Sequence, residues 1–183
     1  MIKIKYEIFE DHVEELKNID LLAFDIDYTE IYGLFTITLN EHDFVPFPDD
    51  NMPLSAKRMF SEGIITHLEL LNEVLTTLNQ HNYVALKYIE NSSSWLEFKV
   101  IKDFIKVSEL EKEVNSLNSL ICTNDKFLIG AKYGSFKEIL VSKKEFEDEV
   151  LQKTKLFLEE IENINPLILK SKYFSLLRNC KPY

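Results

Sequence analysis

Two aspartates near the N-terminus have the most evident chemical potential of any residues in this 183-residue chain. Asp25 and Asp27 follow a short apolar stretch and precede Thr29. Carboxylates two residues apart lie on the same side of a β-strand, where they can act as acid, base or cation ligand. The same alternation fits an ordinary amphipathic strand over residues 21–28, with both aspartates facing outward. Its inward set would be Leu22, Phe24, Ile26 and Tyr28.

The run Asp25-Ile26-Asp27-Tyr28-Thr29 after Leu21-Leu22-Ala23-Phe24 resembles the first motif of haloacid-dehalogenase-type phosphotransferases. The resemblance implies a nucleophile at Asp25, an acid/base at Asp27 and a magnesium ion beside them. That family also requires a crossover helix after each parallel strand and an acidic pair far downstream. Here Thr29 leads straight into another strand pattern, and Asp49-Asp50 comes too early. We favour the strand-surface interpretation, and a magnesium-dependent phosphatase remains the alternative.

The histidines and cysteines show no recognisable site. His12, His42, His67 and His81 include no pair at the spacing of a metal site on a helix or strand. No serine lies in a nucleophile-elbow pattern. Cys122 and Cys180 are too few and too far apart for a disulfide framework or a zinc site, and they fit small buried side chains. We therefore predict no catalytic residue, no metal and no cofactor.

The charge of the chain indicates the kind of partner it would bind. A formal net charge of -10 and a sequence pI near 4.9 argue against nucleic acid and anionic membranes, which both require a basic surface. A cationic protein partner is the natural complement. The predicted contacts are the acids expected to face outward near the loop from Pro48 to Pro53. The acids of the closing helix would only keep the outer face of that helix hydrated. These predicted contacts are Asp25, Asp27, Glu30, Asp49 and Asp50.

The first half of the chain is predicted to form strands followed by a long helix. Strands are expected over residues 2–9, 21–28 and 31–39, and a short edge strand over 44–47. Residues 11–18 are predicted to be a single turn or a loop. A helix is expected over residues 54–80, lying across the sheet. Gly63 either allows close packing within this helix or marks the point after which the regular helix begins.

The second half is predicted to add hairpins and the clearest helix of the chain. Strands are expected over residues 83–90 and 95–107, with a bulge or a junction of two strands near Asp103 and with Trp95 in the core. A short helix is expected over 108–120 and a hairpin over 126–133 and 136–141. The closing helix over 142–164 begins with a capping box at Ser142 and Glu145 and ends at Asn165-Pro166. A shorter helix should follow over 167–177.

Together these patterns predict an α+β fold for residues 1–183 as one domain, with a possible subdivision near residues 81–94. The sheet should be mainly antiparallel, in meanders and hairpins, with a long central helix and a C-terminal helix pair packed on it. The N-terminus lacks the apolar segment of a signal peptide, and no run approaches the length of a membrane span. A cytoplasmic location is therefore expected.

The closing segment, from Ser142-Lys143-Lys144-Glu145-Phe146 through Phe157-Leu158-Glu159-Glu160-Ile161 to Asn165-Pro166, follows a strand-rich acidic body. In this arrangement the chain resembles small bacterial immunity proteins that neutralise polymorphic toxins. The resemblance implies a cytoplasmic antitoxin without catalysis that covers or distorts the active site of a toxin domain. An uncharacterised structural or ligand-binding domain is the remaining possibility.

Overall fold

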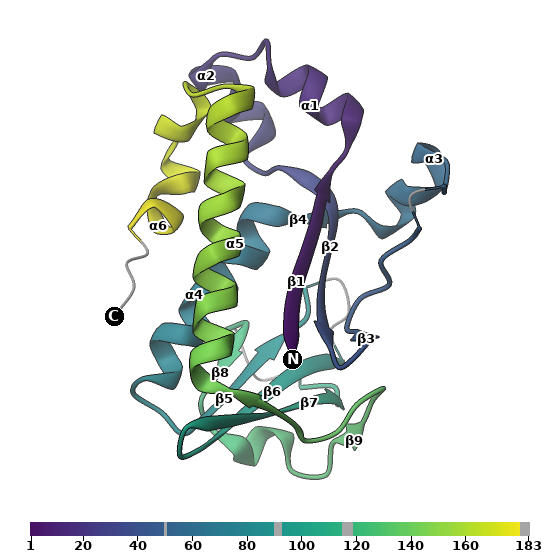
Figure 1. The fold of residues 1–183 in the computed structure, drawn as a ribbon, viewed down its shortest axis with the longest axis vertical. Helices are drawn as coiled ribbons and strands as arrows, with labels where there is room; N and C mark the ends of the chain where they lie inside the picture. The colour runs from purple at the N-terminus through teal and green to yellow at the C-terminus, as the bar shows by residue number, and fades with distance from the viewer. Residues whose placement is uncertain (50, 90–92, 115–118, 180–183) are drawn as a thin grey trace.

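The computed structural model describes residues 1–49, 51–89, 93–114 and 119–179, which form an α+β fold with two antiparallel sheets (Figure 1). The first sheet has the order β1-β2-β3, and β4 also pairs with β2. The second has the order β10-β7-β6-β5-β8, and β9 pairs with β7. The strands are β1 Ile2–Ile8, β2 Tyr32–Leu39, β3 His42–Asp43, β4 Glu62–Gly63, β5 Tyr83–Lys87, β6 Ser94–Ile101, β7 Phe104–Glu111, β8 Ile121–Cys122, β9 Lys132–Tyr133 and β10 Ile139–Ser142.

The helical elements vary widely in length. The α-helices are α1 Glu10–Leu16, α2 Leu21–Ala23, α3 Leu54–Lys57, α4 Ile64–Leu78, α5 Lys143–Ile164 and α6 Ser175–Arg178. A π-helical turn, Phe24–Tyr28, continues α2. The 3₁₀ turns are Arg58–Phe60, Asp125–Leu128, Ile168–Lys170 and Lys172–Phe174.

The helix α5 confirms the prediction for the closing segment. Ser142 Oγ accepts a hydrogen bond from the Glu145 backbone N–H at 3.4 Å, and the helix ends before Asn165 as expected. Side chains at spacings of three and four along 142–164 predict one buried face, and the structure buries Phe146, Val150, Thr154, Phe157 and Ile161 of that set. The helix runs the length of the molecule, from the second sheet to the level of α1 and α2 (Figure 1).

The strand β1 alternates as predicted, with Ile2, Ile4 and Ile8 buried. One edge of β1 pairs with β2, and α5 lies beside it. Glu145 Oε1 accepts from the Ile2 N–H at 3.1 Å, and Glu149 Oε1 accepts from the Ile4 N–H at 2.7 Å. Glu145 therefore satisfies a strand donor rather than completing the capping box. Two carboxylates one helical turn apart thus cover alternate donors on the open edge of β1.

Residues 21–28 are helical, so the predicted strand at this position is wrong. Asp20 caps the segment by accepting from the Ala23 N–H at 2.8 Å, and the π-helical turn closes with Thr29 at φ 60°. Phe24 is fully buried, but Leu22 and Ile26 are 67% and 65% exposed. Asp25 and Asp27 consequently do not face outward from a strand. Most of the segment 11–18, predicted to be a single turn or a loop, lies instead in the helix α1, Glu10–Leu16.

The predicted helix over residues 54–80 is interrupted. After α3 and a 3₁₀ turn, Glu62–Gly63 pairs with β2, and the regular helix α4 begins only at Ile64. Of the two alternatives at Gly63, the structure confirms the later start. A Cβ at Gly63 would lie 2.7 Å from Glu30 Oε2, so glycine permits the close approach of this carboxylate.

Several other boundaries also differ from the predictions. The junction near Asp103 is a turn between β6 and β7 with Lys102 at φ 56°, which confirms the two-strand alternative. The expected helix over 108–120 is wrong where described, because β7 continues to Glu111. The expected last hairpin is wrong because β9 and β10 both pair with β7 rather than with each other. The segment 44–47 forms no strand, and 167–177 is broken into two 3₁₀ turns and α6.

The main hydrophobic core contains buried residues from both sheets, α4 and α5. Phe98 of β6 stacks on Phe146 of α5 with ring centroids 5.3 Å apart, which ties the second sheet to this helix. A smaller cluster comprises Ala85, Trp95, Leu110, Val114, Cys122 and Leu128. Trp95 is fully buried in it, as predicted, and its indole N–H donates to the Lys112 carbonyl at 2.9 Å.

Candidate functional site

The structure gives the two aspartates of the sequence motif different environments. Asp25 is half-buried, and its Oδ1 accepts a hydrogen bond from Ser171 Oγ at 2.5 Å. Asp27 is exposed on the same π-helical turn. The phosphotransferase resemblance requires these residues at the end of a parallel strand, whereas the pairings among the described strands are antiparallel. The described residues include no cluster of three or more His, Cys, Asp or Glu that could hold a metal ion.

Glu30 is a buried structural carboxylate, only 8% exposed, and so is not available as a surface contact. Its Oε1 accepts from the Ile65 N–H at 2.9 Å, and its Oε2 accepts from the Thr66 N–H at 3.0 Å. These donors belong to the first turn of α4, whose N–H groups have no partner within the helix. Glu30 therefore caps α4 from a distant point in the sequence, where the positive end of the helix dipole also favours a carboxylate.

The remaining predicted contacts lie elsewhere. Asp49 is exposed in the loop before α3, and Asp50 lies outside the described residues. The α2 segment and α3 stand at opposite sides of the molecule (Figure 1). The described members of the set Asp25, Asp27, Glu30 and Asp49 therefore do not form one surface.

A buried polar network involves one of the histidines. His67 Nε2 lies 2.7 Å from Glu62 Oε2, and the Tyr88 hydroxyl donates to Glu62 Oε1. The His67 ring stacks on Phe35 with centroids 4.6 Å apart. The adjoining cavity has a volume of about 10 Å³, which is too small for a substrate. This network therefore fixes the start of α4 against the two sheets and does not present a site.

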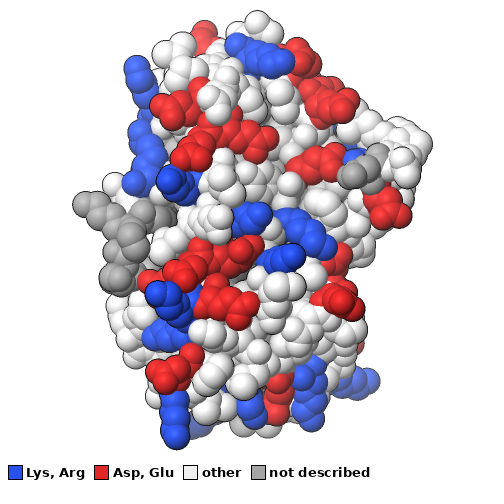
Figure 2. All heavy atoms as spheres, in the orientation of Figure 1, with Lys and Arg blue, Asp and Glu red and all other residues white. Residues whose placement is uncertain are grey.

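Charged side chains are interspersed over the face that carries α5. Figure 2 shows acidic clusters separated by lysines and arginines on this face. Some of these charges form ion pairs, such as Lys155 with Glu159 along α5 at 3.6 Å. The net charge of the chain is therefore not gathered into one uniformly acidic patch on this side, and a local feature must define any site.

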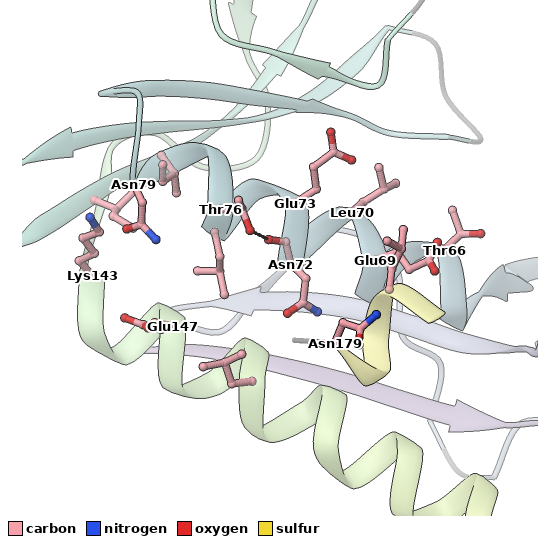
Figure 3. A pocket seen from close by; sticks show the side chains of 15 residues that line it. Thr66, Glu69, Leu70, Asn72, Glu73, Thr76, Asn79, Lys143, Glu147 and Asn179 are labelled. Atoms are coloured by element: carbon pink, nitrogen blue, oxygen red, sulfur yellow. Dashed lines mark hydrogen bonds between the residues drawn. The ribbon is translucent and has the colours of Figure 1, made fainter. Parts of the chain in front are cut away.

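The feature best suited to hold a ligand is a mainly apolar groove bounded by α4, α5 and α6, with a volume of about 450 Å³. Figure 3 shows Asn79 and Lys143 near one end of it, and Thr66, Glu69 and Asn179 near the other. Its apolar lining comes from Leu70, Leu75, Leu78, Ile105, Leu151 and Leu176. We call this feature the helical groove.

The helical groove is locally acidic. Among the described residues that line it are three acids, Glu69 and Glu73 of α4 and Glu147 of α5, and one lysine, Lys143. Within the part of the chain that the structure describes, none of the three carboxylates has a hydrogen-bond or ion-pair partner. Burial, together with the nearby Glu30 charge, raises the pKa of the Glu69 carboxyl above its ordinary value. A cation in the groove would stabilise the ionised Glu69 carboxylate and so oppose this rise in its pKa.

Sequence reasoning missed this groove, although α4 carried a signal for it. The apolar stripe that predicts this helix leaves out Leu70 and Val74, yet both are buried. The stripe consists of Phe60, Ile64, Leu68, Leu71, Leu75 and Leu78. A helix that is apolar over more than one face needs cover on more than one side. The position of α6, which closes one end of the groove, depends on tertiary packing and had no local signal.

Comparison with protein-family models, curated proteins and solved structures found no match to this chain. Among the helices that the structure describes, none combines the length and the apolar character needed to cross a membrane.

Proposed function

We propose that the protein is a non-catalytic binding module that captures a cationic segment of a protein partner in the helical groove. The observation that supports this proposal is the set of three carboxylates, Glu69, Glu73 and Glu147, around an apolar lining. A partner that brings both apolar and cationic side chains would cover the lining and neutralise the carboxylates. Complementary charge would also raise the association rate in a salt-dependent way.

The finer proposal is that the partner is a toxin domain and that binding neutralises it in the cytoplasm. Its support is the resemblance of the closing segment to immunity proteins, because this segment forms α5, one wall of the groove. Co-expression tests this version where a neighbouring gene encodes a secreted protein with a basic C-terminal domain. The parent protein should protect cells from that domain, and a variant with a neutralised groove should protect them less.

A matched pair of peptides tests the binding proposal directly. Two labelled 14-residue peptides share the same leucine positions, and one carries lysine wherever the other carries glutamate. Fluorescence anisotropy at low salt should show at least tenfold tighter binding of the lysine peptide. The triple variant Glu69→Gln, Glu73→Gln, Glu147→Gln should lose most of this preference.

The control variant Asp49→Asn removes an exposed acid outside the groove lining and should leave the affinity unchanged. Equal binding of the lysine and glutamate peptides would refute the proposal. A preference that persists in the triple variant would move the binding site away from the groove.

A further inference from the structure

We infer that the occupant of the helical groove is a cationic amphipathic helix of about three turns, laid along α4 beside α6; this inference rests on the proposed function. The lengths of the surrounding helices indicate how much space a docked helix would have along α4. At 1.5 Å per residue, the 15 residues of α4 span about 22 Å, whereas the four residues of α6 span only about 6 Å. Among the described residues, the helices that pack beside α4 and α5 on this side therefore extend no further than α6.

The walls of the groove favour a helix over an extended peptide. Its lining comes from α4, α5, α6 and their ends, and Ile105 of β7 is fully buried behind them. An extended segment binds by adding to a strand edge, which satisfies its backbone N–H and C=O groups. No strand edge contributes to the lining among the residues that the structure describes, so those groups would be desolvated without partners. A helix satisfies them internally and presents only side chains.

The positions of the carboxylates define the pattern of the occupant. Glu69 and Glu73 are one turn apart on the same helix, and Glu147 projects from the opposite wall. Lysines or arginines four residues apart on a docked helix would match the pair on α4. Leucine-like side chains on the inner face of that helix would pack against Leu70, Leu78 and Leu151.

Charge argues against a second copy of this chain as the occupant. The chain carries a net charge of -10, and its longest helix, α5, has seven acidic residues among its 22. A second copy docked through such a helix would add negative charge to a groove that already holds uncompensated carboxylates. The helical partner must therefore come from a basic protein.

The test compares a peptide that can form an amphipathic helix with two related peptides that cannot form it. The 14-residue leucine–lysine peptide has its leucines at helical spacing. It is measured beside a peptide of the same composition in which the apolar and charged residues alternate, as in a strand, and beside a variant with two central prolines. Anisotropy should show at least tenfold tighter binding of the helical peptide, and circular dichroism of the mixture should show added helicity. Thr76→Trp, at an exposed position of the groove lining, should block binding, whereas Thr123→Trp on an exposed loop should not.

The possible results separate this inference from the proposed function. If all three lysine peptides bind equally and glutamate peptides still do not bind, the inference of a helical occupant is wrong, but the proposal of a cationic partner stands. Loss of the preference for lysine over glutamate would overturn both. Unchanged binding by a correctly folded Thr76→Trp variant would overturn the groove as the site. A variant ending at Asn179 that binds tenfold tighter than the full chain would identify the last four residues as the occupant instead.

Discussion

Glu30 illustrates how a surface acid in the sequence becomes a structural group in the fold. Its carboxylate accepts from the N–H groups of Ile65 and Thr66, and also from its neighbour Ile31 at 2.7 Å. Glu30→Ala should lower the free energy of unfolding by roughly 1–3 kcal/mol for each buried donor left without an acceptor. Urea denaturation measures this loss, and Glu41→Ala, at an exposed position, is the control. Unchanged stability of the Glu30 variant would show that the cap is not made.

Glu69 predicts a pH dependence of stability. Its folded-state pKa is raised by burial and by Glu30, so ionisation of this carboxyl opposes folding. The resulting destabilisation is absent below the ordinary pKa and develops as the pH rises through the raised folded-state pKa. Glu69→Gln should therefore melt at a higher temperature than the parent at pH 7, and the difference should disappear near pH 3, below the ordinary glutamate pKa of about 4.3.

Thermal melts between these pH values check the sign of this effect. Glu73→Gln on the same helix controls for the change in helix propensity, since Glu73 is exposed. A Glu69→Gln variant that is less stable than the parent at pH 7 would mean that the carboxylate has a favourable partner. The same substitution links stability to function, because the charge that destabilises the free protein is one that a cationic partner would neutralise.

At the level of secondary structure, the N-cap of α5 is the clearest sequence signal, and its contribution can be measured. The Ser142 bond to the Glu145 N–H is long, at 3.4 Å. Ser142→Ala should therefore lower the free energy of unfolding by about 0.5–1 kcal/mol, the lower part of the range for such caps. Denaturant titration beside Ser135→Ala, at an exposed loop position, provides the comparison. Equal stability of both variants would show that water replaces the cap.

The edge of β1 leads to a second prediction at the level of secondary structure. Glu145 and Glu149 cover the Ile2 and Ile4 N–H groups, which are the donors that a foreign strand would use. Replacing both glutamates by alanine should expose this edge and promote self-association. Sedimentation at rising concentration should show dimers of the double variant, whereas Asp148→Ala between them should stay like the parent. A double variant with the parent's concentration dependence would mean that α5 itself blocks the edge.

The errors in the predicted elements have physical causes. A period of two over residues 21–28 also contains the four-residue spacing of a helical face, and Phe24 with Tyr28 is such a pair. Asp20, which caps this helix, was the available signal against a strand. At residues 54–80 a continuous apolar stripe concealed the break at Gly63, because the cause of that break is the approach of Glu30, 33 residues earlier. The closing helix was predictable because its cap and apolar stripe are local.

The candidate site was less predictable than the fold for the same reason. The predicted contacts depend on exposure inferred from strand and loop patterns, and the helical conformation of residues 21–28 removes that basis for Asp25 and Asp27. The helical groove instead combines α4 with α5 and α6, which begin 65 or more residues after α4 ends. Composition indicated a cationic partner, but only the packing of the helices shows where uncompensated carboxylates meet an apolar lining.

For the whole molecule, the two cores predict how the protein unfolds. The strands β5, β6 and β7 contribute to the main core and also to the smaller cluster around Trp95. Because the same strands carry both clusters, loss of the smaller one should expose the back of the sheet that the main core requires. The two sheets are further joined through α5, by Phe98 on Phe146 and by Tyr6 on Phe157. We therefore expect one cooperative unfolding transition and a single domain.

Trp95 is the only tryptophan in the chain, so its fluorescence reports on the smaller cluster alone. Far-ultraviolet circular dichroism reports mainly on the helices, of which α4 and α5 are the longest described. Urea titrations followed by the two signals should give coincident midpoints, and Phe146→Ala should shift both together by lowering stability roughly 3–5 kcal/mol. A fluorescence midpoint well below the ellipticity midpoint would divide the chain into two units. Coincident curves would show that the groove helices and the second sheet form a single folding unit, so that a partner bound in the groove would stabilise both.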